Sequence, residues 1–223
     1  MKSKLFILLA VLLFSATVFA QEEKTMYVMK NGEVVFQSAV SDVDSVIFYK
    51  PKPTQQDFVL INGVKWATRN VDAPGTFAAN PEDTGMFYQW NRTKGWSATG
   101  SVTGWDSSMP TGTTWETANN VCPSGYRVPT DAEIDKLIAA SSQWTTQNGV
   151  AGRIFGSGDN PLFLPAAGYR DYSNGTLYIT STNYWSSTQN NTTYAYNLNF
   201  DSGNAFKYSH YRNYGFSVRC VAD

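Results

Sequence analysis

The chain has 223 residues, 17 of them basic and 18 acidic, which gives a formal net charge of −1. So small a charge argues against nucleic acid or an anionic membrane surface as a partner. One histidine and two cysteines are too few for a tetrahedral zinc site, whereas 7 tryptophans, 13 tyrosines and 13 phenylalanines predict a large aromatic core.

Residues 1–20 have the pattern of a secretory signal peptide. Lys2 and Lys4 precede an apolar run at residues 5–14 that is short for a bilayer span, and Val18 and Ala20 fit the cleavage positions. The alternative is an uncleaved membrane anchor, but no stop-transfer pattern or later transmembrane segment follows. We therefore expect an exported protein that is periplasmic, on the cell surface or secreted. Cleavage would leave 15 basic and 18 acidic residues, a net charge of −3.

Residues 21–50 are predicted to form a small β module. Two alternating runs flank Asn31-Gly32, the strongest short signal for a β-hairpin, and residues 41–49 predict a turn and a third strand. Because three short strands cannot bury a core of their own, we expect the module to pack on the main domain or on a partner. Residues 51–56, which begin Pro-Lys-Pro, are interpreted as a short stiff linker.

The main domain is expected to span residues 57–223. It opens with a predicted hairpin at residues 58–66, whose turn is Asn62-Gly63. Residues 70–114 lack periodicity and are rich in Gly, Thr, Ser and Asn, so we expect long ordered loops there. Residues 115–120 could form one or two helical turns.

One helix is predicted from Asp131 to about Ser141. Thr130 and Glu133 have the spacing of a reciprocal capping box at its start. Apolar residues follow at helical spacing and should pack inward: Ile134, Leu137 and Ile138.

Short aromatic runs separated by Asn, Gly, Ser and Asp then predict an antiparallel sheet late in the chain. These runs are residues 177–180, 184–187, 195–200, 205–208 and 215–221. A single helix, several short strands and long loops together predict an α+β fold.

The two cysteines, Cys122 and Cys220, usually pair in an oxidising compartment. Their bond would tie the last strand to the segment before the helix. It would close a loop of about 98 residues and stabilise the fold by about 4 kcal/mol. The alternative is two buried free thiols.

Four segments resemble the Fibrobacter succinogenes major paralogous domain: residues 64–70 (VKWATRN), 122–130 (CPSGYRVPT), 164–170 (LPAAGYR) and 184–188 (YWSST). Residues 125–134 (GYRVPTDAEI) and 215–220 (GFSVRC) resemble the formylglycine-generating-enzyme (sulfatase-modifying-factor) group. Both resemblances imply a C-type-lectin-like fold for residues 57–223. In the enzyme group a structural disulfide joins the same two places, which implies a Cys122–Cys220 pair.

The resemblance to the enzyme group does not extend to its active site. That activity requires a pair of reactive cysteines that bind copper, and residues 184–200 contain none. We therefore expect no copper-thiolate oxidase activity. His210, the sole histidine, has no nucleophile-elbow motif beside it and is interpreted as a packed or surface residue. Arg127 and Arg219 are expected to anchor loops or pair with acids.

Three tryptophans in the loop region, Trp90, Trp96 and Trp105, are the candidate ligand-binding residues. Ring faces beside hydroxyl and amide groups suit sugars and equally suit protein partners. The alternative is that these rings fill the core under the loops, as large aromatic side chains often do. Trp66 and Trp185, inside strand-like runs, are assigned to the core.

Calcium is the one cofactor for which ligands can be named. Asp159, Asn160, Asp201 and Asn204 lie in loops where their oxygens could converge, although such residues more often cap turns.

These features favour an exported, non-enzymatic binding or adhesion module for glycans or other surface polymers. A structural subunit of a cell-surface assembly, which binds a protein partner through the N-terminal module, is the second hypothesis. An enzyme of unknown type on a fold like that of formylglycine-generating enzyme is the third.

Overall fold

The computed structural model describes residues 24–43, 57–158 and 160–223. The chain divides into two compact units, residues 1–54 and 55–223, and each is described by itself. The predicted signal peptide, the linker at 51–56 and the third strand of the N-terminal module lie outside the described residues. Within the described part of the chain, no helix has the length and apolar character needed to cross a membrane.

The first unit contains the hairpin predicted around Asn31-Gly32. Its strands are β1 (Thr25–Lys30) and β2 (Glu33–Ala39), and the 3-10 turn Val40–Asp42 follows. Asn31 and Gly32 have φ angles of 53° and 84°, the left-handed conformation that a tight hairpin turn requires and that Asn and Gly adopt most easily. The hairpin prediction is confirmed.

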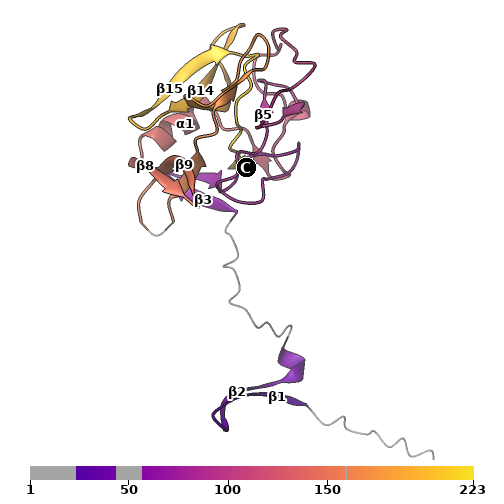
Figure 1. The fold of residues 1–223 in the computed structure, drawn as a ribbon, viewed down its shortest axis with the longest axis vertical. Coiled ribbons are helices and arrows are strands. Elements are labelled where there is room, and N and C mark those ends of the chain that lie inside the picture. Colours follow the sequence, from indigo (N-terminus) through magenta and orange to yellow (C-terminus); the bar gives the residue numbers. More distant parts are fainter. Residues whose placement is uncertain (1–23, 44–56, 159) are drawn as a thin grey trace, which may run out of the picture. The chain divides into compact units, whose positions relative to one another are not determined.

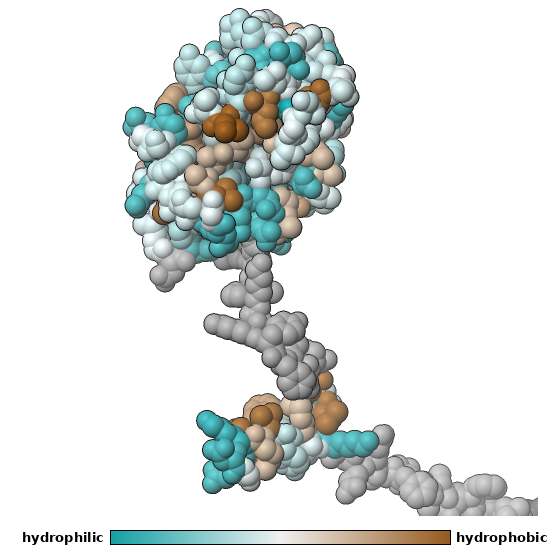
Figure 2. All heavy atoms as spheres, viewed as in Figure 1, coloured by the Kyte–Doolittle hydropathy of each residue, from teal (hydrophilic) through white to brown (hydrophobic). Residues whose placement is uncertain are grey.

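Large hydrophobic side chains are exposed on this hairpin and on the turn that follows it, and Figure 2 shows brown and tan atoms on this unit. They are Tyr27, Val28, Met29, Val34, Val35, Phe36 and Val40. A two-stranded hairpin has no interior in which to bury them. The hairpin therefore offers more apolar surface than a small isolated unit can stabilise.

The second unit is rich in β-structure (Figure 1). Its first strands are β3 (Phe58–Ile61), β4 (Val64–Ala67), β5 (Phe87–Tyr88), β6 (Gly95–Trp96) and β7 (Tyr126–Arg127). The 3-10 turn Thr117–Asn119 precedes β7, and helix α1 (Asp131–Ile138) follows it. The remaining strands are β8 (Ser142–Gln147), β9 (Val150–Phe155), β10 (Leu162–Pro165), β11 (Tyr169–Arg170), β12 (Leu177–Tyr178), β13 (Thr182–Gln189), β14 (Tyr194–Phe200), β15 (Ala205–Tyr211) and β16 (Val221–Ala222).

These strands form several small antiparallel sheets instead of one large sheet. The orders of the three larger sheets are β3-β4-β16-β7, β10-β9-β8 and β13-β14-β15, and β5-β6 and β11-β12 form two-stranded ribbons. Helix α1 packs against the β13-β14-β15 sheet, as Figure 1 shows.

The expected α+β class is therefore wrong, because the second unit is β-rich. Its single α-helix among the described residues has eight residues. The C-type-lectin-like fold that the family resemblance implies is not tested by this finding. Sequence reasoning counted the helix correctly but missed the sheet formed by β8, β9 and β10. This sheet adds strand structure directly after the helix, where none was expected.

Helix α1 itself is confirmed, together with its capping box. The Thr130 hydroxyl accepts a hydrogen bond from the Glu133 backbone N–H at 3.2 Å, and the Glu133 carboxylate accepts one from the Thr130 N–H at 2.8 Å. Ile134 and Leu137 are buried, as expected from their spacing. The helix ends at Ile138, earlier than predicted.

The disulfide between Cys122 and Cys220 is confirmed, with an S–S distance of 2.04 Å. It joins the segment before β7 to the segment before β16, and these strands pair directly, with Val221 opposite Arg127. Both cysteines are buried in a cluster that includes Trp90, Trp185 and Phe216.

We predict that the disulfide contributes strongly to stability. The double variant Cys122→Ala/Cys220→Ala should lose about 4 kcal/mol of unfolding free energy, because the unfolded chain regains the freedom of a long loop. Urea unfolding measures this loss. Reduced wild-type protein is the control, because it lacks the S–S bond but keeps both cysteine side chains. Its loss of stability therefore measures the effect of the covalent link without the effect of the smaller alanine side chains. A loss below about 1 kcal/mol in both samples would contradict the prediction.

Candidate functional site

The three candidate tryptophans are covered by the protein to different degrees. Trp90 is fully buried; its Nε1 donates to the Ser186 carbonyl at 3.0 Å and the Arg212 guanidinium lies 4.3 Å from its ring centre. Trp90 therefore has no ring face open to a ligand.

Trp96 and Trp105 pack against each other, with ring centres 4.7 Å apart. Trp96 is only 4% exposed, and Trp105 is partly buried with its Nε1 donating to the Tyr172 carbonyl at 3.0 Å. The structure thus brings two of the three tryptophans together, as packing for loops, and places Trp90 in a different cluster.

Of the proposed calcium ligands, Asp201 and Asn204 lie together in one turn. The Asp201 carboxylate accepts hydrogen bonds from the backbone N–H groups of Gly203 at 2.7 Å and Asn204 at 3.0 Å, the pattern of an Asx turn between β14 and β15. Asn160 is exposed, and Asp159 lies outside the described residues. Over the described ranges, no group of three or more His, Cys, Asp or Glu side chains is placed to hold a metal ion.

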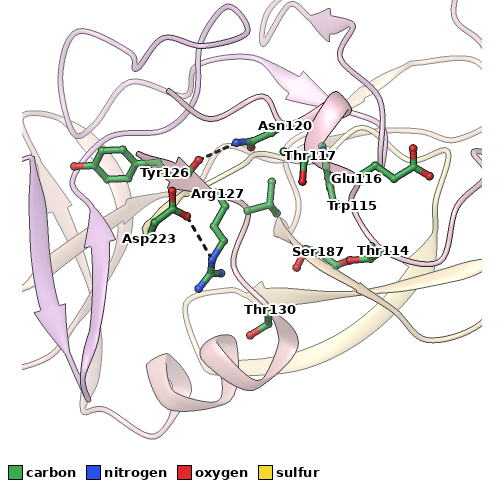
Figure 3. A pocket seen from close by; sticks show the side chains of 11 residues that line it. Thr114, Trp115, Glu116, Thr117, Asn120, Tyr126, Arg127, Thr130, Ser187 and Asp223 are labelled. Carbon is green, nitrogen blue, oxygen red and sulfur yellow. Dashed lines mark hydrogen bonds and ion pairs between the residues drawn. The ribbon is translucent and has the colours of Figure 1, made fainter. Parts of the chain in front are cut away.

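One of several concave sites of similar size is a groove beside the disulfide, with a cavity of about 310 Å³ (Figure 3). Arg127 and Asp223 lie on one side of it, and Thr114 and Ser187 on the other. Its lining consists of Thr114, Trp115, Glu116, Thr117, Asn120, Tyr126, Arg127, Val128, Thr130, Ser187 and Asp223.

Two backbone hydrogen bonds and one from the Asn120 side-chain amide join the segments that form the walls of the groove. Trp115 N–H donates to the Ser187 carbonyl at 2.9 Å, which attaches the segment before the disulfide to β13. The Asn120 amide donates to the Tyr126 carbonyl at 2.8 Å, and Asp223 N–H donates to the Gly125 carbonyl at 3.1 Å. Cys122 and Cys220 lie within three residues of these contacts, so the disulfide holds two of the walls together.

Arg127 is held in place at the edge of the groove by an acidic partner. Its guanidinium makes two parallel hydrogen bonds to the Glu133 carboxylate, at 2.8 and 2.7 Å, and its Nε lies 3.8 Å from Asp223. Burial alone would raise the pKa of Glu133, but the hydrogen bonds from Arg127 and Thr130 outweigh it, and the pKa lies below its ordinary value. The expectation that Arg127 pairs with an acid is confirmed.

The groove combines an apolar floor with a polar rim. Trp115 and Val128 are 7% and 3% exposed and supply the floor. Hydroxyl, amide and carboxylate groups surround it, and Glu133 already neutralises Arg127. Because Glu116 and Asp223 are the other charged side chains of the lining, the site has a negative balance.

His210 lies on β15 and does not line the groove. It packs against the rings of Tyr208, Tyr214 and Phe216, at centre distances of 4.9, 5.5 and 5.3 Å. Burial lowers the pKa of His210 to about 4, so the imidazole is neutral at physiological pH. The interpretation of His210 as a packed residue agrees with this placement.

This buried histidine makes stability depend on pH. Between about pH 6.5 and 4 the unfolded chain binds a proton at His210 and the folded chain does not, so the unfolding free energy decreases as pH falls through this window. We expect a loss of up to about 2 kcal/mol between pH 7 and pH 5. Urea unfolding at both pH values measures the unfolding free energy. The decrease from pH 7 to pH 5 should be smaller in His210→Gln than in the wild type, by up to about 2 kcal/mol. Equal losses in the two proteins would contradict the prediction.

Comparison with known proteins identifies part of this chain only. A family model described as a domain of unknown function (DUF8237) matches residues 147–221, about a third of the chain. No curated protein and no solved structure matches the sequence. The resemblance to the Fibrobacter succinogenes major paralogous domain is not tested by these findings and stays a prediction.

Sequence reasoning missed most residues of the groove. Thr114, Thr117 and Asn120 lie outside any motif, and nothing in the YWSST segment marks Ser187 as their neighbour. The signal that could have located the groove was the segment at residues 122–130. It contains a disulfide cysteine and a helix N-cap, and these two constraints also hold the neighbouring loops in place.

Proposed function

We propose that the protein is an exported binding module that holds a neutral or amino-bearing glycan in the groove beside the disulfide. The observation that carries this proposal is the lining of the groove, in which hydroxyl, amide and carboxylate groups surround the floor formed by Trp115 and Val128. Sugars present hydroxyl groups at their edges and C–H groups on their faces, and such a lining can satisfy both.

The charge of the groove argues for this class of glycan over acidic polymers. Among the described residues, Arg127 is the one basic side chain of the lining, and it is paired with Glu133 through two hydrogen bonds and with Asp223 at 3.8 Å. With Glu116 also in the lining, carboxylates outnumber basic groups at the groove. A carboxylated or sulfated polymer would bring further negative charge to this surface and would be repelled.

Two further features support export and a binding role over catalysis. The Cys122–Cys220 disulfide fits an oxidising compartment, in agreement with the predicted signal peptide. The same bond uses both cysteine sulfurs, and the sole histidine lies outside the groove, so the groove contains hydroxyl and carboxylate groups but no thiol or imidazole.

Titration calorimetry with neutral, amino-bearing and acidic oligosaccharides tests the proposal. We expect binding of neutral or amino-bearing members and none of the acidic ones. Thr117→Trp should weaken that binding about tenfold or more, because the larger side chain fills the groove, while the backbone contact of Thr117 remains.

Thr103→Trp is the matched control, because Thr103 is an exposed threonine that does not line the groove. It should bind like the wild type. Preferential binding of acidic oligosaccharides, or equal binding by wild type and Thr117→Trp, would refute the assignment of the groove.

A second candidate function is a structural subunit of a surface assembly, and the exposed apolar residues of the N-terminal hairpin favour it. Burying that surface against another chain would stabilise both. Size-exclusion chromatography of the mature chain and of a form that lacks residues 21–52 distinguishes the two functions. Assembly predicts larger species only when the hairpin is present, and a monomer in both samples would contradict it.

A further inference from the structure

One face of the β13-β14-β15 sheet carries a row of asparagine side chains. Strand register places Asn183 opposite Asn199, and Asn197 opposite Tyr208, so all four side chains share one face. The three asparagines are at most 9% exposed. Amides are costly to bury unless they are hydrogen-bonded, and such a row is unusual on a sheet face that serves packing alone.

Some polar atoms of this row are paired with one another or with His210, whereas Asn197 Oδ1 is buried without a hydrogen-bond partner among the described residues. The Asn199 amide donates to the Asn183 side-chain carbonyl at 2.8 Å, and the Asn197 amide lies 3.0 Å from His210 Nδ1. With Nδ1 accepting from Asn197, the neutral imidazole carries its hydrogen on Nε2. His210 is therefore an N–H donor whose tautomer is set by its neighbour.

A small pocket opens beside this row, with a volume of about 60 Å³. Its lining mixes aromatic rings with short polar groups: Tyr169, Ser181, Asn183, His210, Tyr214 and Phe216. A water-sized group needs roughly 10–15 Å³, so the pocket accommodates about four to six heavy atoms. It is too small for a sugar ring but large enough for one substituent of a ring.

Two exposed tyrosines stand next to different walls of the pocket. Tyr208 is 54% exposed and its ring centre lies 4.9 Å from that of His210. Tyr178 is 43% exposed and is stacked on Tyr169, with 5.4 Å between the ring centres. A sugar ring whose substituent entered the pocket would therefore have aromatic faces available for its C–H groups.

The pocket is uncharged, which limits the chemistry of the substituent. No Lys, Arg, Asp or Glu lines it, and burial keeps His210 neutral by lowering its pKa to about 4. A carboxylate or an ammonium group would be desolvated there without a counter-charge. A hydroxymethyl group has only two heavy atoms and would leave at least half of the pocket empty. An acetamido group has four, and its carbonyl, N–H and methyl match the donors, acceptors and rings of the lining.

We propose that this pocket binds the acetamido group of an N-acetylhexosamine residue, with the sugar ring against Tyr208 and Tyr178. The site shares no lining residue with the groove beside the disulfide. This proposal extends the proposed glycan-binding function by naming a sugar class, but its test depends only on the residues of this pocket. All six lining residues fall within residues 147–221, the range that the family model matches.

Calorimetric titration of the mature chain with triacetylchitotriose, with cellotriose as the matched sugar without acetamido groups, tests this proposal. We expect the acetylated trimer to bind at least about tenfold more tightly. Tyr208→Ala and Tyr178→Ala should each weaken its binding about fivefold, the loss expected for one aromatic contact. Ser181→Leu, which fills the pocket, should abolish the preference for the acetylated trimer.

Tyr27→Ala is the control for the tyrosine variants, because Tyr27 is a strand residue of similar exposure, 55%, in the other unit. Its affinity should equal that of the wild type, and melting temperatures show whether each variant is folded. Equal affinity for the two trimers, or an unchanged preference in folded Ser181→Leu, overturns the proposal. Loss of the preference in Ser181→Leu, with the preference retained in Thr117→Trp, supports this pocket independently of the groove.

Discussion

The covalent bond between Cys122 and Cys220 is the constraint on which the second unit depends most. The residues that it joins are 98 positions apart, yet they directly precede the paired strands β7 and β16. Strand β16 has only two residues, and it lies between β4 and β7 in its sheet. So short a strand has few hydrogen bonds of its own, and the disulfide compensates by fixing its position. This arrangement of β7 and β16 also determines the positions of the residues that form the walls of the groove.

Buried arginines fix the positions of the long loops. Arg170, Arg212 and Arg219 are at most 1% exposed, and each donates hydrogen bonds to backbone carbonyls. Arg170 alone reaches the carbonyls of Ser97 at 2.7 Å and Gly175 at 2.7 Å. Desolvation lowers the pKa of all three guanidinium groups, but these groups stay charged at neutral pH. Arg170 and Arg212 donate to carbonyls of residues 97–112, whereas Arg219 donates to Ala67 at the end of β4. This explains how residues 70–114 can be ordered with little regular structure.

Local signals in the sequence predicted local structure well and distant contacts poorly. Asn-Gly turns identified the hairpins at Asn31 and Asn62, and the same signal at Asn148-Gly149, with φ angles of 48° and 83°, marks the missed turn between β8 and β9. The capping box predicted α1. By contrast, the burial of Trp90 and the convergence of residues 114–120 with Asp223 depend on contacts across the whole domain. No spacing in the sequence encodes such contacts.

The central claim is that the disulfide holds the groove in the form that binds its ligand. Hydrogen–deuterium exchange of the oxidised and the reduced protein, under conditions in which both remain folded, tests this claim most directly. The account predicts faster exchange after reduction at residues 114–128 and 216–223, and unchanged exchange in the β8-β9-β10 sheet. Unchanged exchange at the groove, or a uniform increase over the whole unit, would contradict it.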